Sequence, residues 1–280
     1  MMAFQRVATL VLILLWYGPT VAVAQSAAPA VIAAPSLTPE QMEQFLLNAR
    51  FVSLKTVRQG VTGTRRATFT DGQLTHDVQI QTIDESRATF ETPKGVELDF
   101  KDTFRYNIAA YRLAVMLGLD NVPMSVARPF QGAPAAHTWW LDDVMFDEGG
   151  RLKAKSTGPD PQRFASFVHI QRVFDQLIDN TDRNIGNSLW TRDWKMWMVD
   201  HTRAFRRSTE LRNPARLERV DRGLLTALRG LTAASVKAAV GDSLTELEID
   251  PLIVRAGLIV ALFDKKIAAT SEARVLYTKR

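Results

Sequence analysis

The 280-residue chain contains no cysteine, and this absence removes several classes of chemistry at once. Disulfide bonds, thiol nucleophiles and cysteine-ligated metal sites are all excluded. The fold must therefore be held together by its core. The composition, 46% hydrophobic and 23% charged, is typical of a folded globular protein.

Histidine is scarce as well, and other common site motifs are missing. The four histidines show no spacing of a zinc-binding helix motif, and no Gly-x-Ser-x-Gly segment supports a serine hydrolase. The net charge is +5, yet no run of basic residues exceeds two. We therefore expect no zinc site and no nucleic-acid partner, and we expect the tryptophans to pack in the core rather than stack on bases.

Long apolar runs are absent except at the N-terminus. Arg6 precedes an uncharged apolar run over residues 7–17, Pro19 interrupts it, and Ala22-Val23-Ala24 has the small-x-small pattern of a cleavage site. This pattern predicts a signal peptide over residues 1–24 and a secreted or periplasmic protein without a transmembrane segment after cleavage. The alternative is an uncleaved membrane anchor, for which the run is short.

The next part of the chain changes from a linker to mainly β-type patterns. Residues 25–50 read as an Ala- and Pro-rich linker and a short helix, with Thr38 as N-cap, Pro39 at the first position and Gln41 completing a capping box. Residues 51–83 predict a β-meander. A helix is expected over 102–117, followed by strands over 122–128 and 138–146.

A polar Gly- and Pro-containing stretch from residue 148 to 161 marks a boundary, and the pattern beyond it is mostly helical. A strong helix is predicted from Pro161 to Ile178, then a hairpin of strands 187–190 and 195–199, then helices from residue 217. The order predicts an α+β fold. Its β-rich lobe spans 51–147, its helical lobe with a small β-hairpin spans 148–280, and a cleft lies between them.

Three oxygen-bearing side chains around this hairpin form a chemically meaningful set. Asp182 lies in the loop before it, Asn187 begins its first strand, and Asp200 follows its second strand. Folding of the hairpin returns Asp200 to the side of Asn187. Phosphoryl transfer needs one carboxylate at the acceptor and an oxygen-rich pair that holds magnesium against phosphate groups, and these residues provide that set.

The same segments resemble known kinases. Asp-Arg-Asn-Ile-Gly-Asn, residues 182–187, resembles the catalytic loop of phosphatidylinositol 3- and 4-kinases. Val-Asp-His-Thr-Arg-Ala-Phe, residues 199–205, resembles the metal-binding segment of the secretory-pathway Golgi casein kinase group and its Four-jointed and HipA-type relatives. Residues 108–113, 117–119 and 122–123 are similar to the helix and following strand of the N-lobe in that group.

This resemblance implies a bilobal protein-kinase-like fold that binds ATP and magnesium or manganese between its lobes. Asp182 would be the catalytic carboxylate, and Asn187 and Asp200 would be the metal ligands. Gly60 and Gly63 would form the turn over the phosphates. The acceptor, a protein or a small molecule, is not specified by the sequence.

The sequence also departs from active kinases, which place a lysine on the third strand and pair it with a glutamate in the N-lobe helix. By position these roles fall to Gln81 and Asn107, which carry no charge. The candidate cations to take the place of the lysine are Arg65, Arg66, Lys94 and Lys101. A pseudokinase that binds nucleotide or acts as a scaffold is therefore the alternative function, and transfer of a nucleotidyl group from the same metal site is a third.

Overall fold

A capped helix opens the described part of the chain. The computed structural model describes residues 37–55, 65–92 and 95–279, so the predicted signal peptide lies outside it. Helix α1 (Pro39–Asn48) begins after Thr38, whose hydroxyl accepts from the Gln41 N–H while the Gln41 side chain accepts from the Thr38 N–H. The structure thus contains the predicted capping box, which satisfies two backbone donors that the first helical turn leaves free.

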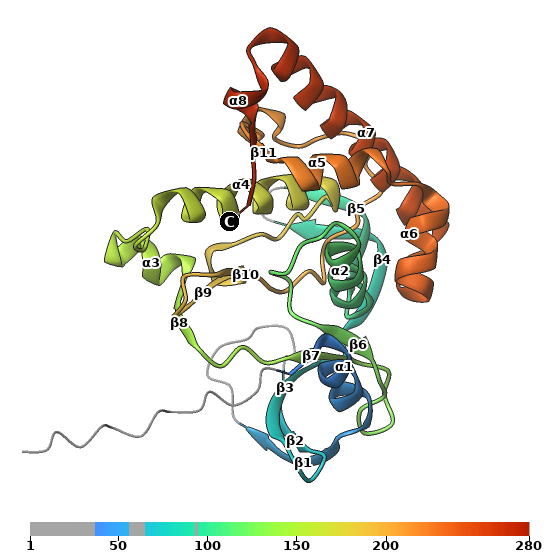
Figure 1. Cartoon of the computed structure of the whole chain (residues 1–280). Helices are drawn as coiled ribbons and strands as arrows, with labels where there is room; N and C mark the ends of the chain where they lie inside the picture. The colour runs from blue at the N-terminus through green and yellow to red at the C-terminus, as the bar shows by residue number, and fades with distance from the viewer. Residues whose placement is uncertain (1–36, 56–64, 93–94, 280) are drawn as a thin grey trace, which may run out of the picture. The chain divides into compact units, whose positions relative to one another are not determined.

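An antiparallel five-stranded sheet forms the body of the N-terminal lobe (Figure 1). Its strand order is β1-β2-β3-β7-β6. The strands are β1 (Arg50–Lys55), β2 (Arg65–Thr70), β3 (Thr75–Gln81), β6 (Ser125–Ala127) and β7 (Ala136–Trp139). Side chains alternate between the two faces of a strand, so one face of β3 packs Val78 and Ile80 against Phe45 and Leu46 of α1. The other face carries Asp77, Gln79 and Gln81.

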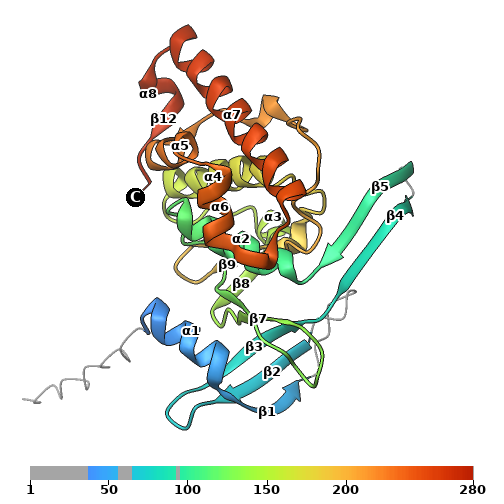
Figure 2. The same ribbon diagram turned by 90° about the vertical axis from the view of Figure 1, so that its right-hand side faces the viewer.

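A two-stranded ribbon is inserted between β3 and the helix of this lobe. Strands β4 (Asp84–Thr92) and β5 (Gly95–Thr103) pair antiparallel and extend beyond the five-stranded sheet (Figure 2). The sequence analysis did not predict this ribbon, and it expected helix from residue 102. Helix α2 instead begins at Arg105 (Arg105–Met116), so Asp102 lies on a strand.

The C-terminal lobe is built from helices packed on one continuous core. Helix α4 (Pro161–Leu177) begins after Asp160, whose side chain accepts from two backbone N–H groups of the first turn. Its buried Phe174 and Leu177 share a core with Ile259 and Phe263, and Leu113 of α2 joins the same core. The remaining helices are α3 (Glu148–Ala154), α5 (Arg222–Arg229), α6 (Ala233–Val240), α7 (Glu246–Ala269) and α8 (Glu272–Val275).

Two small sheets complete this lobe. The predicted hairpin is present as β9 (Ser188–Thr191) and β10 (Met196–Met198), and β8 (Val144–Asp147) pairs with β9 on its other side. β11 (Val220–Asp221) pairs parallel with β12 (Leu276–Tyr277). The predicted α+β fold is confirmed, with a β-rich N-terminal region and a mainly helical C-terminal region. The strand expected over 138–146 is wrong in its bounds, because β7 ends at Trp139 and β8 begins at Val144.

Candidate functional site

The β9–β10 hairpin places two of the predicted site residues side by side. Met198 pairs with Ser188, and the Val199 N–H donates to the Asn187 carbonyl at 3.1 Å. Asp200 is the next residue along. It has a φ of 55°, in the left-handed region that non-glycine residues rarely adopt and that Asp tolerates better than most. The hairpin therefore returns Asp200 to Asn187, as its sequence spacing predicts.

The loop that carries Asp182 is closed by its own side chains. The Asn180 side-chain oxygen accepts from the Asp182 N–H at 3.1 Å, and the Asn187 amide Nδ2 donates to the Asp182 carbonyl at 3.1 Å. These two bonds fix both ends of the turn. They leave the Asp182 carboxylate close enough to Asp200 to raise the pKa of the Asp200 carboxyl.

Arg183 braces this loop, although the sequence analysis gave it no role. Its Nη1 donates to the Asn187 carbonyl at 2.5 Å and to the Val199 carbonyl at 2.9 Å, while its Nε lies 3.0 Å from an Asp175 oxygen. Its Nη2 lies 3.1 Å from His201 Nε2, which must be the acceptor because a guanidinium has only donors. One side chain thus ties α4, the loop and the strand before Asp200 together.

A third carboxylate, that of Asp102, lies beside Asp200 and was also missed. Asp102 is the last residue but one of β5, and the N–H of the final residue, Thr103, donates to the Thr202 carbonyl at 2.9 Å. Burial raises the pKa of the Asp102 carboxyl, and the negative charge of Asp182 adds to this rise, whereas a hydrogen bond from Thr202 opposes it. Only the folded chain brings residue 102 to residue 200, so no local sequence signal could have shown this neighbour.

The same forces act on Asp200. Burial raises the pKa of its carboxyl, the charges of Asp102 and Asp182 raise it further, and the Thr202 hydroxyl, 3.1 Å from Asp200 Oδ1, opposes the rise. Carboxylates that repel one another in a partly desolvated place gain stability when a cation joins them. The electrostatics of the site therefore favour a bound cation.

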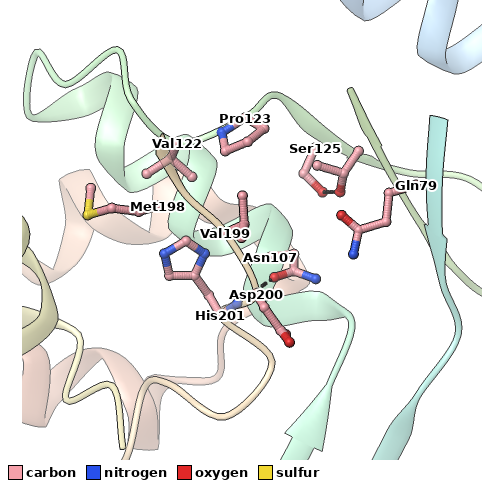
Figure 3. A pocket seen from close by; sticks show the side chains of 10 residues that line it. Gln79, Asn107, Val122, Pro123, Ser125, Met198, Val199, Asp200 and His201 are labelled. Carbon is pink, nitrogen blue, oxygen red and sulfur yellow. Dashed lines mark hydrogen bonds between the residues drawn. The ribbon is translucent and has the colours of Figure 1, made fainter. Parts of the chain in front are cut away.

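A small pocket in front of Asp200 receives side chains from both lobes (Figure 3). Its cavity volume is about 10 Å³, room for roughly one water molecule. In Figure 3 the amide of Gln79 extends from β3 toward the space before Asn107 and Asp200. The Asn107 oxygen accepts from the His201 N–H at 2.8 Å, which ties α2 to the segment after Asp200. Thr138 and Ser125, which lie 2.9 Å apart through their hydroxyls, also line this pocket.

Gln81, which by position was expected in the place of the kinase lysine, lies elsewhere. Its side chain is buried, and its oxygen accepts from the N–H groups of Thr82 and Ile83 at 3.1 and 3.3 Å. Gln79, two residues earlier on the same face of β3, lines the pocket instead. The alternation of the strand could have suggested Gln79, but its register was not evident from sequence.

The cations considered as substitutes for the lysine have other partners where they are described. Arg66 Nε donates to Asp77 at 2.6 Å, and the Arg66 guanidinium lies over the Trp140 ring, 4.2 Å from its centroid. Lys101 Nζ is 2.5 Å from Glu248 Oε1, and Arg65 lies 3.4 Å from the Gln131 oxygen. The predicted phosphate-turn residues Gly60 and Gly63, and Lys94, lie outside the described residues.

The donor set suits a hard cation completed by a phosphorylated ligand. Within residues 37–55, 65–92 and 95–279, no three acidic, histidine or cysteine side chains already form a metal cage. Magnesium commonly takes only one or two carboxylates from a protein and fills its remaining positions with water and phosphate oxygens. Asp200 and the Asn187 amide oxygen fit that pattern, as they also do for manganese.

The fold is similar to that of two solved kinases. The structure of hydra Fam20 with sugar matches with a TM-score of 0.61 and 13% identity, over 86% of this chain and 92% of that chain. The fold is kinase-like. The crystal structure of the Golgi casein kinase gives a TM-score of 0.60 and 12% identity over 86% of this chain and 78% of that one. At these identities the likeness establishes the fold alone.

The other comparisons add little. The Helicobacter pylori proinflammatory kinase CtkA matches with a TM-score of 0.48 and 10% identity over 81% of this chain and 98% of that chain, and no argument rests on it. No protein-family model and no curated protein matches the chain. The expected likeness to the Golgi casein kinase group is confirmed at the level of fold, and that to phosphatidylinositol kinases and HipA-type kinases stays a prediction. None of the described helices has the length and apolar character needed to cross a bilayer.

Proposed function

We propose that the chain is an exported kinase-like phosphotransferase that binds ATP with magnesium or manganese between its lobes. Asn187 and Asp200 would hold the cation against the phosphates, and Asp182 would orient the hydroxyl of a protein or small-molecule acceptor. The bond from Val199 N–H to the Asn187 carbonyl carries this proposal, because it brings the two metal ligands together beside the Asp182 loop. The bound cation would neutralise charge that develops on the phosphate being transferred.

A pseudokinase is the second candidate, and one observation favours it. Gln81 and Asn107, which by sequence position replace the lysine and glutamate of active kinases, carry no charge, and the pocket is lined by Asn107 and the equally neutral Gln79. Neutral amides can hydrogen-bond to phosphate oxygens, but they supply no positive charge. A protein with this pocket would bind nucleotide weakly and transfer phosphate slowly or not at all.

Thermal unfolding with manganese and ATP tests the binding part of the proposal. A ligand at about 100 times its Kd stabilises the native state by about 2.7 kcal/mol, which corresponds to a rise in Tm of roughly 5–10 °C for a chain of this size. We expect the full rise only when manganese and ATP are both present, and a smaller rise with manganese alone. Asp200→Asn should abolish it, and Asp142→Asn, a control at an exposed acid paired with His76, should keep it.

Transfer of the γ-phosphate from labelled ATP then separates the two candidates. The phosphotransferase should label itself or an added acceptor, and Asp182→Asn should slow this labelling by about 100-fold or more. Stabilisation by manganese and ATP without any labelling would support the pseudokinase. Stabilisation that persists in Asp200→Asn would contradict both.

A further inference from the structure

Asp102 is the least satisfied carboxylate of the site. The residue is 6% exposed, and its Oδ1 is buried without a hydrogen-bond partner among the described residues. A buried ionised carboxylate without full pairing costs several kcal/mol, on the order of the desolvation penalty for one ion, so a chain retains it chiefly when something else binds it. The orphaned oxygen therefore points to a ligand that the protein alone does not provide.

The two acids share the Thr202 hydroxyl. Its one proton can be donated to only one of them at a time, either to Asp200 Oδ1, which lies 3.1 Å away, or to Asp102, whereas the Thr202 N–H also donates to Asp200. The backbone bond from Thr103 N–H to the Thr202 carbonyl holds Asp102 at this position. Two carboxylates are thus fixed around one hydroxyl, and neither can turn away to solvent without breaking that backbone contact.

The charges around Asp102 do not neutralise it. Glu85 and Asp182 add negative potential at Asp102, and Asp102 in turn acts on Asp200. Among the described residues, Arg203 is the cation that acts on Asp102, and its Nη2 lies 3.0 Å from Glu97, which also pairs with Arg206 at 2.6 Å. Arg203 thus opposes the negative potential at Asp102 but donates no hydrogen bond to the buried Oδ1.

We propose that Asp102 is a ligand of a divalent cation that it shares with Asp200, and that this cation supplies the positive charge that Gln79 and Asn107 lack. This inference deepens the proposed function and rests on it for the role of Asp200. Two carboxylates, water and phosphate oxygens would complete an octahedral shell for magnesium or manganese. A cation in this place would attract phosphate groups as the kinase lysine does, with twice its charge.

Manganese alone, without nucleotide, is the probe for this site. Electron paramagnetic resonance measures the loss of the signal of hydrated Mn²⁺ as protein is added. Asp102→Asn keeps the shape of the side chain and removes its charge, and it should weaken Mn²⁺ binding by about tenfold or more. Asp102→Ser, smaller and also neutral, should give the same loss. The control Asp142→Asn should bind as the wild type does.

The Tm of each protein without metal separates this loss from misfolding. Removal of a buried charge with an unpaired oxygen should leave the Tm of Asp102→Asn unchanged or higher, while its binding of Mn²⁺ falls. Binding equal to wild type in Asp102→Asn, with binding lost in Asp200→Asn, would overturn this inference and leave the proposed function standing. No binding of Mn²⁺ alone by the wild type would also overturn it. Binding unchanged in both variants would overturn the inference and the proposed function together.

Discussion

His137 shows how strongly a single side chain can be set by its surroundings. It lies in β7 with no exposed surface, between Phe69 at 5.3 Å and Phe130 at 6.1 Å between ring centroids. Neither ring nitrogen has a hydrogen-bond partner within the described part of the chain. Burial, with a smaller contribution from Arg128, lowers the pKa of His137 to about 4, so the ring is neutral in the folded protein at neutral pH.

This lowered pKa makes stability depend on pH in a defined window. Between pH 6.5 and 4, His137 binds a proton in the unfolded chain but not in the folded protein, so the free energy of unfolding falls as the pH falls. The change is roughly 3 kcal/mol for this residue. His137→Leu should remove this contribution to the pH dependence of the free energy of unfolding, measured by urea denaturation at pH 7, 5 and 4. An equal pH dependence in variant and wild type would show that His137 is protonated when folded.

At the scale of elements, the loop that carries Asp182 is held by α4 and by the hairpin as well as by its own side chains. Arg183 joins the loop to Asp175 of α4 and to the carbonyls of Asn187 and Val199. Both members of the Arg183–Asp175 pair are largely buried, at 14% and 12% exposure of their side chains. A lysine has one nitrogen and cannot reach all three partners at once.

Arg183→Lys should therefore lower both stability and cation affinity. The expected loss in the free energy of unfolding is about 2–3 kcal/mol, since part of a buried ion pair and two hydrogen bonds are lost. Arg172→Lys is the matched control, because Arg172 on α4 pairs with an exposed Glu218 and should change stability by less than about 0.5 kcal/mol. Chemical denaturation and Mn²⁺ titration measure the two effects. Similar losses of stability and of Mn²⁺ affinity in Arg183→Lys and Arg172→Lys would argue against a special role of Arg183 in holding the loop.

Sequence patterns predicted most accurately the elements that local signals determine. Helix α4 was predicted by its Asp-Pro start and apolar face, and the hairpin by two short apolar runs around a turn. The β4–β5 ribbon was missed although β5 carries a local strand signal, since Val96, Leu98 and Phe100 alternate with charged residues. What the sequence could not show is where the ribbon packs, because that depends on distant contacts such as the ion pair between Glu97 and Arg203.

The residues of the candidate site also divide into those that local sequence indicates and those that only the tertiary structure shows. Asp182, Asn187 and Asp200 could be proposed from sequence because the loop and the hairpin that carry them are continuous along the chain. Gln79 and Asp102 were not found, because the first depends on which face of β3 meets the pocket and the second on the end of a strand predicted as helix. Both depend on tertiary structure.

At the scale of the molecule, α2 joins the two lobes. Its Leu113 belongs to the core of the C-terminal lobe, and the Tyr106 hydroxyl donates to Glu248 of α7 at 2.5 Å. Burial, with the adjacent Glu248 charge, raises the pKa of Tyr106, so the hydroxyl keeps its proton. The side-chain oxygen of Asn107, on the same helix, accepts a hydrogen bond from the His201 N–H. Contacts within the chain thus assemble the site across the lobes, and phosphoryl transfer depends on positioning of this kind.

Anomalous X-ray diffraction from crystals grown with Mn²⁺ and a non-hydrolysable ATP analogue tests the central claim most directly. The account predicts a manganese peak within coordination distance, about 2.0–2.3 Å, of an Asp200 oxygen and the Asn187 amide oxygen, with phosphate oxygens completing the shell. A nucleotide bound without manganese at these two residues, or manganese bound only at other acids, would contradict it.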